Sequence, residues 1–182
     1  MGLIHSFNKS LEIWLARQGI SNIEVGEGAE YTYRYERHKI EWGLISNEKV
    51  EHDFGQFFYE YGITGVTLDR VNILVLSFLH EVGHVMTFFN FDENERELDN
   101  SAKEVIDNNF DYWDLPTEFA ANIWTINWVE DHAAAYNELL EMFKACFIAI
   151  SEDEDIVAQI YDWMDEVMID PELELIIVEG DE

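Results

Sequence analysis

The sequence is poor in positive charge and in cysteine. Its 182 residues include 10 Lys and Arg against 39 Asp and Glu, which gives a formal net charge of -29. A field of this sign repels the phosphates of nucleic acids and anionic lipid headgroups, so direct binding of either is not expected. The single cysteine, Cys146, cannot close an intramolecular disulfide, and nothing therefore indicates an oxidising compartment.

Features of a secretory signal and of a linker are also missing. The N-terminus lacks the basic segment and the apolar segment of a secretory signal. The apolar run at residues 71–89 contains two His and one Glu, which argues against a membrane span. No internal repeat and no biased linker divides the chain. We therefore expect a cytoplasmic protein with a single domain over residues 1–182, made of a core at about residues 1–132 and a helical C-terminal extension at 133–182.

The apolar content is sufficient for a folded core. Hydrophobic residues make up 48% of the chain and aromatic residues 14%, which excludes a disordered protein despite the charge. A chain of this length can bury a core without disulfides. The acidic surface has two interpretations, which are ordinary solubility and the binding of a basic partner.

The spacing of apolar residues predicts an α+β protein. Strict alternation at residues 31–35 and 40–44 indicates a hairpin. Residues 173–178 are compatible with a strand or with a helical end. Helices are predicted at residues 3–18, 71–89 with Asp69 as N-cap, 117–130, 133–150 and 156–168. The other predicted segments are a connection at 24–30, a short strand at 57–63, and an acidic loop at 90–114 with one short helix at 102–106.

Two histidines on the apolar segment 71–89 suit a single metal ion. In a helix, His80 and His84 are separated by roughly 40° at ~100° per residue, so both imidazoles leave the same face about one turn apart. Glu81 completes an H-E-x-x-H arrangement, in which the glutamate acts on a water molecule rather than binding the metal. Burying these three side chains on so apolar a helix would be costly without a partner.

A catalytic zinc site usually takes three protein ligands, so one more must come from elsewhere. A histidine six positions after His84 is excluded, because that position is Asn90. Glu118 lies in the expected first turn of an apolar helix, where a carboxylate can be held rigidly. It is equally explained as an acidic residue favoured by the positive end of a helix dipole. The other acidic candidates lie in a polar run that solvation alone explains; they are Asp92, Glu93, Glu95, Glu97 and Asp99.

Two motifs taken together resemble a known family. H-E-V-G-H at residues 80–84, followed by E-F-A-A-N at residues 118–122, is similar to the ImmA/IrrE-like zinc metallopeptidases, whose pattern is H-E-x-G-H on one helix and E-x-x-A-N on a later one. The resemblance covers residues 71–129, about a third of the chain. It implies a zincin-like fold, in which the active-site helix packs on a small sheet and additional helices follow at the C-terminus.

The resemblance also implies the roles of the site residues. His80, His84 and Glu118 would bind Zn²⁺, and Glu81 would serve as general base and later as proton donor. The implied activity is zinc-dependent cleavage of an intracellular protein. Family members are often encoded beside transcriptional repressors, or on phages and mobile elements, and act on a regulatory DNA-binding protein.

Two questions remain open at the level of sequence. The group that stabilises the oxyanion could be Tyr112, His132 or Tyr136, although His132 would lie about 21 Å from Glu118 along a continuous helix. The competing function is a non-catalytic acidic protein that occupies the DNA-binding face of a basic partner as a nucleic-acid mimic.

Overall fold

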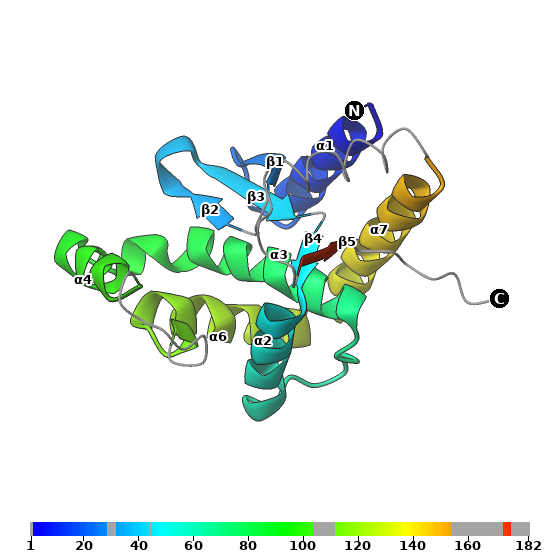
Figure 1. The fold of residues 1–182 in the computed structure, drawn as a ribbon. Helices are drawn as coiled ribbons and strands as arrows, with labels where there is room; N and C mark the ends of the chain where they lie inside the picture. Colours follow the sequence, from blue (N-terminus) through cyan, green and yellow to red (C-terminus); the bar gives the residue numbers. More distant parts are fainter. Residues whose placement is uncertain (1, 29–31, 44, 104–111, 154–172, 176–182) are drawn as a thin grey trace. The chain divides into compact units, whose positions relative to one another are not determined.

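The computed structural model describes residues 2–28, 32–43, 45–103, 112–153 and 173–175. Within these residues the predicted α+β class is confirmed, with six α-helices, a three-stranded sheet and a two-stranded sheet (Figure 1). Contacts divide the chain into two compact units, Met1–Glu48 with Asn137–Glu182, and Lys49–Tyr136. The expected single domain with a core at about residues 1–132 stays a prediction.

Most of the predicted helices are confirmed. Their ends agree with the expected ends within two residues, because apolar periodicity and capping residues are local signals. The expected helix at 156–168 and the residues after 175 lie outside the described residues. The confirmed helices are α1 (Gly2–Arg17), α3 (Arg70–Thr87), α6 (Pro116–Asp131) and α7 (Ala133–Ser151).

The first unit contains both sheets. Strands β1 (Glu24–Gly28) and β3 (Lys39–Gly43) pair in parallel, and β2 (Thr32–Arg34) pairs antiparallel with the other edge of β3. Strands β2 and β3, joined by the 3-10 turn η1 (Tyr35–Arg37), form the predicted hairpin. The ambiguous C-terminal segment contributes a strand, because β5 (Leu173–Leu175) pairs antiparallel with β4 (Ile45–Asn47).

The prediction of a connection at residues 24–30 is wrong, because the first five of these residues form β1. Its glycines suggested a loop, but Gly26 has a packing role in the sheet. A Cβ at Gly26 would lie 2.7 Å from Cε of Lys39, so the missing side chain makes room for Lys39 on the neighbouring strand.

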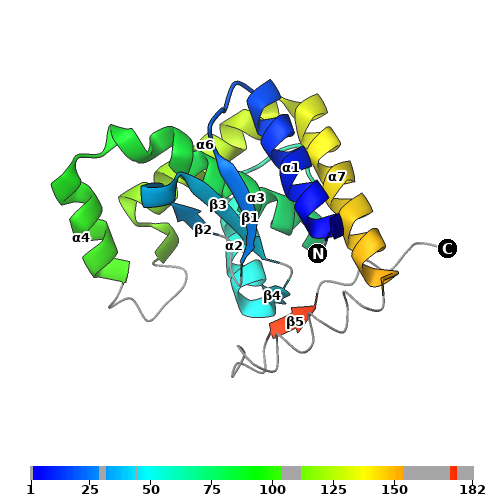
Figure 2. The ribbon, with the colours of Figure 1, turned by 90° about the horizontal axis from the view of Figure 1, so that it is seen from above.

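An aromatic cluster forms the core of the first unit. Helices α1 and α7 lie side by side (Figure 2), and the rings of Phe7 and Phe143 meet edge to face at 5.2 Å. Trp42 of β3 packs against both rings, at 5.1 and 5.8 Å. The indole N–H of Trp42 donates to Oδ1 of Asn8 at 2.7 Å, which satisfies the buried polar group of this cluster.

Helix α2 (Glu48–Glu60) replaces the short strand expected at residues 57–63. Phe54, Phe57 and Phe58 are buried and follow the i, i+3, i+4 spacing of a helix face. The aromatic composition suggested a strand, but the spacing of the buried rings is helical.

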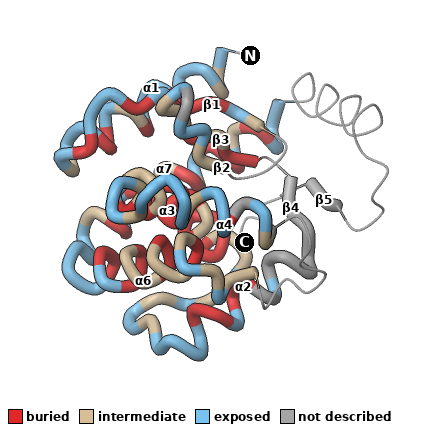
Figure 3. The backbone as a smooth tube through the Cα atoms, turned by 90° about the vertical axis from the view of Figure 1, so that its left-hand side faces the viewer, coloured by how far each residue is buried: buried red, intermediate tan, exposed pale blue. Residues whose placement is uncertain are grey.

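Helix α4 (Glu93–Lys103) occupies much of the expected acidic loop and begins well before residue 102, so this prediction is wrong. Asp92 and Glu95 start the helix with a capping box. The Glu95 N–H donates to Oδ1 of Asp92 at 3.0 Å, and the Asp92 N–H donates to Oε2 of Glu95 at 2.7 Å. Most described residues of α4 are exposed (Figure 3).

Most residues of helix α3, in the second unit, are buried. It begins after Asp69, the predicted N-cap, whose Oδ1 accepts the Asn72 N–H at 2.9 Å. A 3-10 turn, η2 (Phe88–Asn90), follows its end. The segment Arg70–Asn90 is long and apolar enough to cross a membrane, but 67% of its apolar window is buried inside the protein, as in a core helix.

Candidate metal centre

Helices α3 and α6 lie side by side and run antiparallel (Figure 1). His84 of α3 meets Glu118 of α6, and His80, one turn earlier on α3, meets Asn122, one turn later on α6. Both motifs place side chains at i and i+4, so an antiparallel contact brings the two pairs together. The second motif therefore lies against the first.

Gly83 allows the two helices to approach closely. A Cβ at this position would lie 2.5 Å from the carbonyl oxygen of Ala121 and 3.0 Å from its Cα. Ala121, itself fully buried, presents only backbone and a methyl group at the contact. The glycine in H-E-V-G-H thus sets the distance between the histidines and Glu118.

Three potential ligand atoms converge at this contact. Nε2 of His80 lies 3.0 Å from Nε2 of His84 and 3.0 Å from Oε2 of Glu118. The third edge of the triangle, from Nε2 of His84 to Oε2 of Glu118, is 3.2 Å. In a tetrahedral site with zinc-ligand bonds of about 2.1 Å, ligand atoms are roughly 3.4 Å apart. The observed triangle is only slightly smaller, so it has the dimensions of a metal site.

Glu81 lies beside the triangle. Its Oε1 is 3.9 Å from Nε2 of His80, whereas Oε2 of Glu118 is 3.0 Å from the same atom. One ligand atom from each of His80, Glu81 and His84 lies within 4.8 Å of the others, so Glu81 can also reach a shared ion. The shorter distances favour Glu118 as the third ligand and leave Glu81 adjacent to the triangle.

The cluster combines burial with the negative charge of two carboxylates. The Glu118, His80 and Glu81 side chains are 1, 5 and 8% exposed. Burial alone would raise the pKa of Glu118, but the contacts with His84 and His80 hold it well below its usual value. Burial alone would lower the pKa of His80, but Glu118 and Glu81 raise it. Two buried carboxylates therefore favour a cation here, either as protons on the imidazoles or as a metal ion.

Asn122 fixes the orientation of His80. This fully buried side chain places Oδ1 2.7 Å from Nδ1 of His80. An amide oxygen only accepts, so Nδ1 carries the proton, and the lone pair on Nε2 faces His84 and Glu118. Nδ2 of Asn122 is buried without a hydrogen-bond partner in the described part of the chain. An unsatisfied buried N–H group lowers stability, so an asparagine at this position needs another reason. The hydrogen bond to His80 provides that reason.

If the centre holds zinc, Asn122→Leu should weaken its binding by about 10- to 100-fold, as loss of a group that orients a ligand does. Thermal stability should be retained, because the substitution also removes the unsatisfied amide. The zinc dissociation constant is measured by competition with a chromophoric chelator, beside a thermal melt. Thr125→Val is the matched control, since Thr125 is fully buried on the same helix and donates to the Ala121 carbonyl instead. Wild-type affinity in Asn122→Leu would contradict the assigned role.

Two aromatic rings wall the His80 side of the centre. The His80 ring meets Phe54 of α2 at 5.4 Å and Trp113 at 5.6 Å, both nearly perpendicular. These rings keep water from one side of the site. The His84 side chain is 15% exposed, the most of the four, so the centre is most open to solvent at His84. Sequence patterns did not single out these two rings, because Trp113 lies in the expected acidic loop and Phe54 lies where no helix or strand was predicted.

Comparisons with known protein families, with curated proteins and with solved structures find no match. The resemblance to the ImmA/IrrE-like metallopeptidases therefore rests on the two motifs.

The candidates for oxyanion stabilisation differ in position. His132 stacks on Trp128 and bonds its carbonyl oxygen at the far end of α6 from Glu118. Tyr136 donates to Oδ1 of Asn72, which lies about 12 Å before His80 along α3. Tyr112 remains near the centre, because its ring is 4.9 Å from Trp113.

The acidic candidates from residues 92–99 do not join the two histidines and have other positions on α4 or at its start. Asp92 and Glu95 form the capping box of α4, and Asp99 accepts the N–H of Thr117. Glu93 and Glu97 are exposed on α4. Of the acidic residues considered from the sequence, Glu118 is the one that joins the two histidines.

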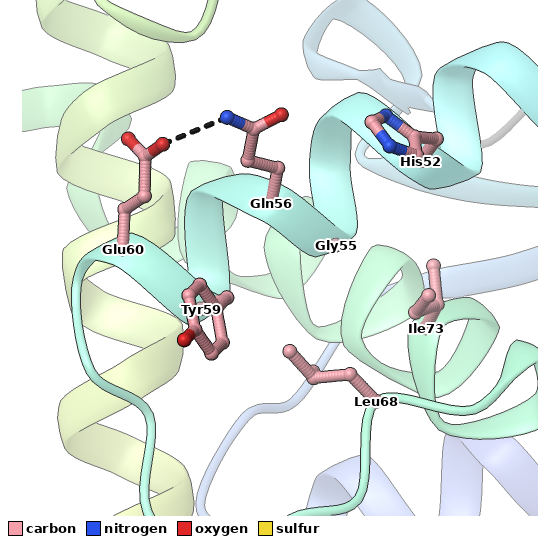
Figure 4. Close-up of a pocket in the computed structure, with 7 residues that line it drawn as sticks. All are labelled: His52, Gly55, Gln56, Tyr59, Glu60, Leu68 and Ile73. Atoms are coloured by element: carbon pink, nitrogen blue, oxygen red, sulfur yellow. Dashed lines mark hydrogen bonds between the residues drawn. The ribbon is translucent and has the colours of Figure 1, made fainter.

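A separate hollow of about 440 Å³ lies beside α2 (Figure 4). Its lining includes Tyr59 and Gln56 of α2, with Leu68 and Ile73 opposite, and includes none of the four residues of the centre. Ile73 precedes His80 by about 10 Å along α3. The hollow is therefore not part of the candidate metal centre.

Proposed function

We propose that the chain is a zinc-dependent metallopeptidase of the ImmA/IrrE type that cleaves an intracellular protein. The observation that carries the proposal is the buried triangle formed by His80, His84 and Glu118, with Glu81 beside it. The zincin-like fold and a single bound Zn²⁺ belong to the same proposal.

The donor set fits catalytic zinc. Two imidazole nitrogens and one carboxylate oxygen are the protein ligands of one group of catalytic zinc sites, which keep a further position open. A structural zinc site normally has four closed protein ligands, whereas among the described residues three side chains form the triangle and Glu81 lies farther from it. Zinc bound at the triangle would polarise a peptide carbonyl and activate water at neutral pH.

Glu81 is the proposed general base. It takes a proton from the attacking water, whose oxygen bonds to the peptide carbonyl carbon, and later gives that proton to the leaving amide nitrogen as the C–N bond breaks. Glu81 as a whole residue is 6% exposed, and its carboxylate lies beside His80. The carboxylate is therefore close to any substrate held at the triangle. Tyr112 is the remaining proposed group for stabilising the oxyanion.

Charge guides the proposal about the substrate. A protein with a formal charge of -29 attracts basic surfaces, and a regulatory DNA-binding protein presents one. We therefore propose such a protein in the cytoplasm as the substrate, without nucleic acid or membrane binding.

Glu81→Gln should retain zinc and lower cleavage by about 10²- to 10⁴-fold, because an amide cannot take the proton. The probe is a mixture of peptides from a cell extract, incubated with zinc-loaded protein, with new termini counted by mass spectrometry. Glu97→Gln makes the same change on exposed α4 and should cleave like wild type. Equal cleavage by Glu81→Gln would refute its role, and no new termini with the wild type would refute the peptidase.

The net charge also favours a second candidate function, a non-catalytic protein that binds the DNA-binding face of a basic partner. In that case Glu81→Gln would keep its full biological effect. A loss of effect in this variant, with zinc retained, would favour the peptidase.

A further inference from the structure

Helix α6 lacks a capping side chain of its own. Leu115 occupies the N-cap position in an extended conformation and provides no side-chain cap, and Pro116 follows it without an N–H. The next amide, that of Thr117, donates to Oδ2 of Asp99 at 2.9 Å. Glu118 is the residue immediately after Thr117. The turn that carries the proposed third ligand is therefore capped by a side chain from another helix, α4.

Asp99 differs from its neighbours on α4. It is 6% exposed, whereas the carboxylates of Glu93, Glu95 and Glu97 are exposed on the same helix. A buried carboxylate needs compensation, and the Thr117 N–H with the positive end of the α6 dipole supplies it. Asp99 thus places its charge at the first turn of α6.

The same helix is also fixed to the end of α3. Nη1 of Arg96 donates to the carbonyl oxygens of Phe91 and Phe88, at 2.6 and 3.2 Å, and the guanidinium lies 4.4 Å from the centre of the Phe88 ring. Phe88 is the C-cap of α3, and its N–H bonds the His84 carbonyl. Arg96 and Asp99 are one turn apart on α4, so this helix joins the end of α3 that carries His84 to the start of α6.

We propose that Asp99 is a positioning residue for the metal centre, which holds the first turn of α6 so that Glu118 meets His80 and His84. This inference rests on the proposed zinc site. It gives the largely exposed helix α4 a role in setting the distance between ligands from two helices.

Asp99→Ala is expected to raise the zinc dissociation constant by about 10- to 100-fold, as for other residues that orient a ligand. The visible spectrum of the Co²⁺-substituted protein should change, because Glu118 would be displaced within the coordination without being lost from it. In the metal-free protein, the Thr117 amide should lose protection from hydrogen exchange. Asp99→Asn keeps an acceptor oxygen and should recover most of the affinity. Glu97→Ala, an exposed position on the same helix, is the control and should match wild type.

Asp99→Glu covers the case in which the alanine variant does not fold. It keeps the charge but moves the oxygen by one methylene, so a lower zinc affinity and an altered Co²⁺ spectrum are expected. Wild-type affinity and spectrum in the folded Ala or Glu variant would overturn the positioning role and leave the zinc site intact. A wild-type protein that binds neither Zn²⁺ nor Co²⁺ would overturn both proposals.

Discussion

We expect Glu118→Ala to abolish the proposed tight binding of zinc, with a dissociation constant raised well beyond the roughly 10- to 100-fold effect of losing a supporting residue. Glu118 supplies one corner of the triangle, 3.0 Å from Nε2 of His80 and 3.2 Å from Nε2 of His84. Without it, two imidazoles remain, fewer than the three protein ligands of a catalytic zinc site. The measurement is a zinc titration of the metal-free protein against a chromophoric chelator.

Glu130→Ala is the matched control for this experiment. It makes the same substitution on α6 at an exposed position near the other end of the helix, where Glu130 accepts a hydrogen bond from Thr64. Zinc affinity should be unchanged. If Glu118→Ala instead kept the wild-type affinity, the third ligand would have to be another group, and Glu81 is the adjacent carboxylate. Glu81→Gln would then lose zinc, in contrast to the retention expected above.

Gly83→Ala should be strongly destabilising. The added Cβ would lie 2.5 Å from the Ala121 oxygen, and backbone atoms cannot move aside as the end of a flexible side chain can. Overpacking of this kind typically lowers the free energy of unfolding by about 1–3 kcal/mol, and sometimes by more. The higher helix propensity of alanine offsets only about 1 kcal/mol. Because the overlap is with backbone atoms, we expect a cost at the upper end of this range and a net loss of about 2 kcal/mol, measured by denaturant unfolding. Zinc binding should also be weaker, because α6 is displaced.

Two other helical glycines provide a graded control. A Cβ at Gly2 of α1 would meet nothing within 4 Å, so Gly2→Ala should leave stability unchanged or slightly raise it. A Cβ at Gly55 of α2 would lie 3.0 Å from Cδ1 of Ile73, a side-chain terminus that can shift, so Gly55→Ala should fall between the two. A Gly83 variant as stable as the Gly2 variant would contradict the close contact between α3 and α6.

Local patterns in the sequence predicted the elements that carry the centre. The apolar spacing of residues 71–89 and the N-cap Asp69 predicted α3, and the helix predicted at residues 117–130 corresponds to α6. The spacing of His80 and His84 placed them on one face. Sequence spacing alone left Glu118 as one of several acidic candidates, because its place beside the histidines depends on how α6 packs against α3.

Helices α2 and α4, which lie near the centre, were not predicted from the sequence. The Asp92 and Glu95 capping box and the helical spacing of Phe54, Phe57 and Phe58 were present in the sequence and could have predicted α4 and α2. The bond from Asp99 to Thr117 joins two helices, and no local pattern specifies it.

The metal content of the purified, tag-free protein tests most directly the claim that His80, His84 and Glu118 hold a zinc ion. After dialysis against buffer without chelator, we expect about one zinc per chain, and the same stoichiometry when metal-free protein is titrated with Zn²⁺. A folded protein that retains no zinc and takes up none on titration would contradict the account.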